Sequence, residues 1–165
     1  TGVGLVNIRE RLKALYGTGA RLVIEENAPR GVVATIEVDV PAPAPAGLSG
    51  AGLRTFFRIM DRWQVDEGVR LRLLGASRST YFRWRADPES ARLGPDTLER
   101  LSYVFGIYKA LHILLPNEAA ADSWVNRPNA HPLFAGGTPL QRLHGGQVAD
   151  LFVVRQYLDA ERGWG

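Results

Sequence analysis

Arginines gather in one stretch of the sequence, where their side chains could bind phosphate. Between Gly68 and Ala86 there are five arginines and no acidic residue, although the 165-residue chain has a formal net charge of only +3. Because attraction to phosphate depends on local charge, this stretch indicates nucleic-acid binding more strongly than the net charge does. A solvated helix face without a ligand is the alternative.

Residues that could support catalysis or hold a metal are scattered along the chain. His112, His131 and His144 are isolated from one another, and there is no cysteine. Without cysteine the chain has no disulfides and no Cys-based zinc site. No Ser/His/Asp order and no pair of carboxylates stands out. We therefore expect no enzyme, no catalytic residue, no bound metal and no cofactor.

Local signals place the arginines on a helix-turn-helix. Gly75 ends a predicted short helix over 66–74, and Ser77 is a favourable N-cap for the next helix, over 78–86. Tyr81 and Trp84 have the spacing of an inward face. The outward residues of the second helix would then read bases, and the flanking arginines would bind phosphate. The candidate DNA-binding residues are Arg70, Arg72, Ser77, Arg78, Ser79, Thr80, Phe82, Arg83 and Arg85.

Helical periodicity continues on both sides of this motif, so the predicted fold is mostly α. An amphipathic helix is expected over 53–63, and a long helix with a wide apolar face from Pro95 onward. Thr138 and Pro139 favour the start of a short helix, and the last helix is predicted over 147–162. On that last helix Phe152 has the spacing of the packed side, whereas Val154 and Tyr157 lie off it.

A different module precedes the helices. Residues 1–41 predict a helix followed by a β-hairpin, which gives this fragment an α+β character. The segment from Pro41 to Gly52, PAPAPAGLSGAG, has the composition of a spacer. The predicted division is therefore a fragment over 1–41, a linker over 42–52, a helix-turn-helix over 53–93 and a further helical domain over 94–165. No apolar run long enough to span a bilayer and no signal-peptide core is visible, so we expect a cytoplasmic protein without membrane contact.

The opening segment GVGLVNIRERLKALYG resembles the C-terminal part of the ATP-binding domain of LytS-like sensor histidine kinases. There a GxGL box opens a helix, and its glycines let the backbone approach phosphate. Gly2, Gly4 and Leu5 match that box as a vestigial nucleotide site. The other motifs of that family lie upstream in its members and are missing here. The resemblance implies a truncated fragment that does not bind ATP.

The remainder, from about residue 51 to 165, resembles the Xre/MbcA/ParS antitoxins. The segment RPNAHPLFAGGTPLQRL and the end RQYLDAERG carry the most specific part of the likeness. The resemblance implies a bacterial antitoxin whose C-terminal domain occludes a RES-domain, NAD-degrading toxin. It also implies repression of its own operon through the helix-turn-helix. The implied toxin contacts are Asn129, Pro132, Leu133, Phe134, Pro139, Leu140, Arg155, Tyr157, Leu158, Arg162, Gly163, Trp164 and Gly165.

Two other functions stay open at this point. The chain could be a fragment of a two-component sensor kinase, which would predict nucleotide binding. It could also be a helix-turn-helix regulator with an unrelated partner, which would bind an operator without neutralising a toxin. A homodimer is expected for DNA binding, since two recognition helices would lie about 34 Å apart on a palindromic operator.

Overall fold

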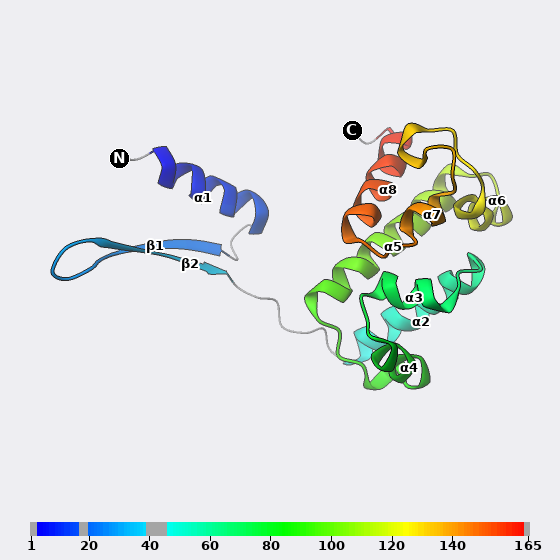
Figure 1. The fold of residues 1–165 in the computed structure, drawn as a ribbon, viewed down its shortest axis with the longest axis horizontal. Helices are drawn as coiled ribbons and strands as arrows, with labels where there is room; N and C mark the ends of the chain where they lie inside the picture. Colours follow the sequence, from blue (N-terminus) through cyan, green and yellow to red (C-terminus); the bar gives the residue numbers. More distant parts are fainter. Residues whose placement is uncertain (1–2, 17–19, 39–45, 164–165) are drawn as a thin grey trace. The chain divides into compact units, whose positions relative to one another are not determined.

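The computed structural model describes residues 3–16, 20–38 and 46–163, which fall into two compact units, Thr1–Ala42 and Pro43–Gly165. Gly2, Trp164 and Gly165, named above as candidate site residues, lie outside the described residues. Figure 1 shows the helices and strands of both units. The mostly α fold with one small hairpin is confirmed.

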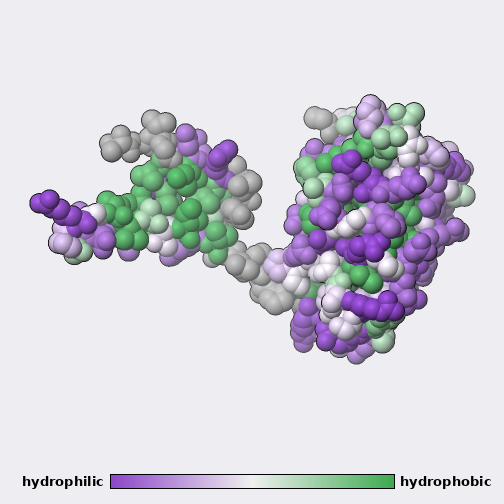
Figure 2. Space-filling view, viewed as in Figure 1, coloured by the Kyte–Doolittle hydropathy of each residue, from purple (hydrophilic) through white to green (hydrophobic). Residues whose placement is uncertain are grey.

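The N-terminal unit is a helix beside a two-stranded hairpin. It contains α1 (Val3–Tyr16), β1 (Ala20–Glu26) and β2 (Val32–Val38). The strands are antiparallel, with Leu22 opposite Ile36. All of β2 is exposed, and Figure 2 shows apolar side chains on the surface of this unit. Because this unit has so few elements, some of its apolar faces stay uncovered. This is expected for a piece below the usual size of an independent domain.

All the regular elements in the described residues of the C-terminal unit are helices. Its elements are α2 (Ala46–Arg62), α3 (Glu67–Leu74), α4 (Arg78–Ala86), η1 (Pro88–Ser90), α5 (Pro95–Leu114), α6 (Glu118–Ser123), η2 (Trp124–Asn126), η3 (Pro132–Phe134), α7 (Pro139–Leu143) and α8 (Val148–Glu161).

The first helix of this unit starts earlier than the linker composition predicts. Residues 46–52 were expected to be spacer, but they form the first turns of α2. Ser49 is fully buried there, and its Oγ accepts a hydrogen bond of 3.3 Å from the Leu93 backbone N–H. Small residues suit this position because they let α2 lie close to the loop before α5. The Pro/Ala/Gly composition therefore misplaced the end of the linker.

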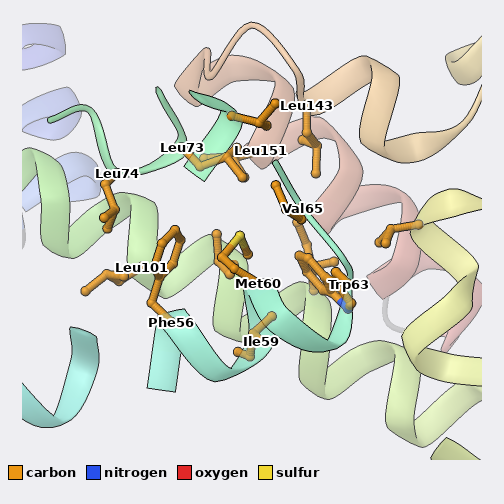
Figure 3. Packing of buried hydrophobic residues seen from close by; sticks show 14 of the residues in the cluster. Phe56, Ile59, Met60, Trp63, Val65, Leu73, Leu74, Leu101, Leu143 and Leu151 are labelled. Atoms are coloured by element: carbon orange, nitrogen blue, oxygen red, sulfur yellow. The ribbon is translucent and has the colours of Figure 1, made fainter. Parts of the chain in front are cut away.

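One hydrophobic core joins all the helices of the C-terminal unit. Figure 3 shows Phe56, Met60 and Trp63 of the α2 region in the same cluster as Leu143 and Leu151 from the opposite end of the sequence. The apolar face predicted for α2 is thus buried in this core, and α2 contacts α5 and η1. The core has no boundary between the helix-turn-helix and the later helices.

Helix α5 is the axis of this unit, and α8 lies beside it (Figure 1). The two helices run in the same direction, because Tyr103 contacts Phe152 and, further along both helices, Leu111 and Leu158 line the same pocket. On α8 the sequence assigned two apolar residues to the wrong side. Val154 is fully buried and Phe152 is 42% exposed, because the buried face follows residues 151, 154 and 158 at helical spacing.

Candidate functional site

The helix-turn-helix forms as its local signals predict. Gly75 adopts a left-handed conformation with φ 66° and ends α3. The Ser77 hydroxyl caps α4 by accepting a hydrogen bond of 3.3 Å from the Thr80 N–H. Tyr81 and Trp84 are buried and fasten α4 to the core, with the Tyr81 ring 5.9 Å from that of Phe57. Helix α4 is therefore held with one side toward solvent.

The solvent side of α4 carries two arginines without acidic neighbours. We call the exposed residues Ser77, Arg78, Ser79, Phe82 and Arg83 the recognition face. The Arg78 guanidinium lies 5.1 Å from the centre of the Phe82 ring, a cation–π arrangement. Within residues 46–163, as far as the structure describes them, neither Arg78 nor Arg83 pairs with a carboxylate. Thr80, also a candidate, is half-buried at the edge of this face.

Arg70 and Arg72 are engaged in contacts inside the unit. The side chain of Arg70 is 11% exposed; it donates to the Val65 carbonyl at 2.7 Å and pairs with Asp61 at 2.6 Å. Arg72 donates to the His144 carbonyl at 2.9 Å. Helical spacing did not reveal these partners, because Asp61 lies in α2, Val65 in the turn after it and His144 in the junction between α7 and α8. Phosphate binding by these two arginines stays a prediction, and these internal contacts would compete with it.

Arg85 has partners as well, although it remains exposed. It donates a 3.2 Å hydrogen bond to the Tyr81 hydroxyl and pairs with Glu67 at 3.2 Å. The hydrogen bond to Tyr81, and to a smaller extent the charge of Glu67, raises the pKa of the Arg85 guanidinium. Arg85 therefore keeps its charge and lies at the border of the recognition face.

Several of the predicted toxin contacts instead form the interior. Phe134 is 6% exposed and Leu158 is 2% exposed, and Pro139 is buried at the start of α7. They were selected from motif segments whose apolar residues serve the fold. Phe134 and Pro139 therefore have little surface to offer a partner, whereas Leu158 contributes to the lining of a pocket. Asn129 is half-buried and shapes its own turn: its N–H donates to the Gly137 carbonyl, and its side chain accepts from the His131 N–H.

Other candidates remain at the surface. Pro132 and Gly163 are exposed, whereas Leu133, Leu140 and Arg162 are half-buried. Arg155 lies across Gly106 of α5 and pairs with Asp159 at 2.7 Å. Tyr157 is the centre of an aromatic cluster, with its ring 5.4 Å from Phe134 and stacked at 6.3 Å on Trp124.

A pocket opens beside this cluster, where α5 and α8 both end. Its volume is about 210 Å³. Sequence reasoning identified two of its residues, Tyr157 and Leu158, but not those from α5 and η2, because the segments that form it lie far apart in the chain. The residues lining this α5–α8 pocket are Leu111, Leu114, Leu115, Trp124, Tyr157, Leu158 and Glu161.

The part of the chain that the structure describes has neither a group of metal-binding side chains nor a membrane-spanning helix. There, no group of three or more His, Asp or Glu residues could hold a metal ion. None of the described helices is both long enough and apolar enough to cross a bilayer. Gly4 and Leu5, which the kinase resemblance matches to a glycine box, lie in the first turn of α1.

In a comparison with known proteins, both parts of the C-terminal unit match domains of antitoxins. Residues 42–106 match the family model described as the antitoxin Xre-like helix-turn-helix domain, and residues 110–163 match the antitoxin Xre/MbcA/ParS C-terminal toxin-binding domain. Both matches lie outside residues 1–41, so the kinase resemblance of that segment stays a prediction. The protein named "Uncharacterized protein y4oB" from Sinorhizobium fredii (strain NBRC 101917 / NGR234) is 46% identical over 114 residues, 68% of this chain and 85% of that protein.

Proposed function

Because the chain belongs to the Xre/MbcA/ParS antitoxin family, we propose that it neutralises a RES-type, NAD-degrading toxin and represses its own operon. The observation that carries this proposal is the succession of an Xre-like helix-turn-helix and a toxin-binding domain in one chain. Neutralisation would be by occlusion, with the surface around α8 and the chain end covering the entrance of the toxin's active site.

DNA binding would use the recognition face. Arg78 and Arg83 are exposed and unpaired within residues 46–163 as described, and an arginine can bind guanine O6 and N7 together in the major groove. Ser77 and Ser79 are at the first turn of α4, where side chains of a recognition helix reach base edges. Arg85 would contact phosphate at the border. We propose a homodimer on DNA, with one recognition helix in each half-site.

A growth-rescue experiment tests the neutralisation. The protein encoded next to the gene for this chain is expressed alone and together with the full chain, while growth and cellular NAD are followed. We expect NAD and growth to fall with the neighbour alone and to recover on co-expression, with both proteins copurifying. If the neighbour is harmless or does not copurify, the toxin assignment fails and a regulator with an unrelated partner becomes the better account.

A further inference from the structure

We propose that the α5–α8 pocket receives one apolar side chain of the toxin, and that a lysine or arginine next to that side chain lies at the pocket rim. This inference rests on the proposed function and specifies how the toxin is bound. All seven lining residues fall within residues 110–163, the segment that matches the toxin-binding domain. The pocket is therefore part of the region to which the family assigns partner binding.

The size and the lining of the pocket favour one aromatic or branched aliphatic side chain as its occupant. At about 210 Å³ it is somewhat larger than the cavities of ~150 Å³ that hold a benzene ring. Leucines from α5 and α8 and the ring of Trp124 form most of the wall. Filling it with one aromatic or branched aliphatic side chain would bury apolar surface on both partners, as anchor residues at the centres of interfaces do.

The negative charge at the pocket rim favours a lysine or arginine of the toxin next to that apolar side chain. Glu161 is exposed, and within residues 46–163 as described its carboxylate has no cationic partner. Helices α5 and α8 both end at the pocket, at Leu114 and Glu161, and a helix C-terminus carries partial negative charge. The nearby acid Asp159 is already paired with Arg155 and Arg162. A cation of the partner is therefore the complement of this rim.

The pocket wall is preformed by internal contacts. Trp124 stacks on Tyr157 with their planes 17° apart, and the Tyr157 ring also contacts His131 and Phe134. These contacts join η2 and η3 to α8, so the partner would not have to order the wall on binding. A preformed pocket lowers the entropic cost of association.

Cysteine protection tests the inference, using the copurifying neighbour protein as the probe. The chain has no native cysteine, so Leu114→Cys introduces a single thiol in the pocket wall. Ile113→Cys is the matched control, since Ile113 is the preceding residue, is 53% exposed and does not line the pocket. We expect the complex to slow iodoacetamide labelling at position 114 by tenfold or more, and to slow it much less at 113.

Binding measurements on charge variants complete the test. Glu161→Lys is expected to weaken binding of the neighbour about two- to fivefold, as for an exposed ion pair, with a smaller loss at high salt. Glu10→Lys makes the same charge change on α1 and should leave binding unchanged. If the unchanged chain binds but positions 113 and 114 are labelled alike, or Glu161→Lys binds normally, the pocket inference is overturned while the proposed function stands. If the unchanged chain does not bind the neighbour, both fail.

Discussion

The proposed DNA binding depends most on two exposed arginines, Arg78 and Arg83. The other three arginines of the basic stretch form hydrogen bonds with other residues of the unit. The sequence predicts the stretch and the helix that displays it, because Ser77 and Gly75 are local signals. It does not predict which guanidinium groups are free. Arg70 is occupied by the carbonyl of Val65 and the carboxylate of Asp61, which only the folded chain brings within reach.

Removing the two free arginines should weaken DNA binding selectively. We expect Arg78→Ala combined with Arg83→Ala to lower affinity for a duplex from the region upstream of the gene, by about 1–3 kcal/mol for each lost bidentate contact to guanine. Binding of the neighbour protein should be unchanged. The control is Lys109→Ala with Arg127→Ala, which removes the same charge from exposed positions. Equal loss of DNA and toxin binding would show that the two surfaces are not separate.

Arg70→Ala should affect folding instead. Its removal leaves the buried part of its site without the hydrogen bonds to the backbone and the pair with Asp61, which should cost about 1–3 kcal/mol of unfolding free energy. Urea unfolding followed by circular dichroism measures this cost. A variant with unchanged stability and a large loss of DNA affinity would return Arg70 to the DNA-binding surface.

At the scale of elements, α5 connects the two functional domains. The helix-turn-helix match ends at 106 and the toxin-binding match begins at 110, both within α5 (95–114). Arg100 of α5 donates to the carbonyls of Arg72 and Gly146, joining α3 to the α7–α8 junction. The individual helices could be predicted from capping residues such as Thr138 and Asn117. Their shared packing could not, because it depends on contacts between residues far apart in the chain, such as Arg100 with Arg72 and with Gly146, 28 and 46 positions away.

The junction between α7 and α8 offers a sharp test of this packing. Gly146 has φ 69°, and a β-carbon there would lie 2.5 Å from the Arg72 carbonyl oxygen. Gly146→Ala should therefore lower the free energy of unfolding of the unit by more than about 1 kcal/mol. The added β-carbon would strain the backbone at position 146 and push the α7–α8 junction away from α3. Gly145→Ala is the control, since the nearest atom is 3.9 Å away. Similar melting temperatures for the two variants would refute the close approach.

At the scale of the whole molecule, the C-terminal unit places its two proposed surfaces far apart on one core. Thr97 and Arg100 of α5 contact the helix-turn-helix, whereas Leu114 lines the pocket. Fourteen residues of helix separate Arg100 from Leu114, a distance of about 20 Å. The helix-turn-helix and the pocket are therefore attached to opposite ends of α5.

The N-terminal unit should be dispensable for both activities. We expect a chain lacking residues 1–42 to fold and to bind the neighbour protein as the full chain does, because the core of the C-terminal unit lies within 46–163 as described. Deleting through residue 50 should instead lower stability, since it removes buried Ser49 and the first turn of α2. Thermal unfolding and affinity of both truncations against the full chain check this. Loss of toxin binding by a folded 43–165 chain would assign the N-terminal unit a role.

The most direct test of the antitoxin assignment is NAD consumption by purified components. The protein encoded next to this chain's gene is incubated with NAD, and the full chain is added in increasing amounts. The account predicts that NAD loss falls in proportion to the chain added until it stops, as the two proteins form a stable complex. NAD loss that continues unchanged in the presence of excess chain would contradict it.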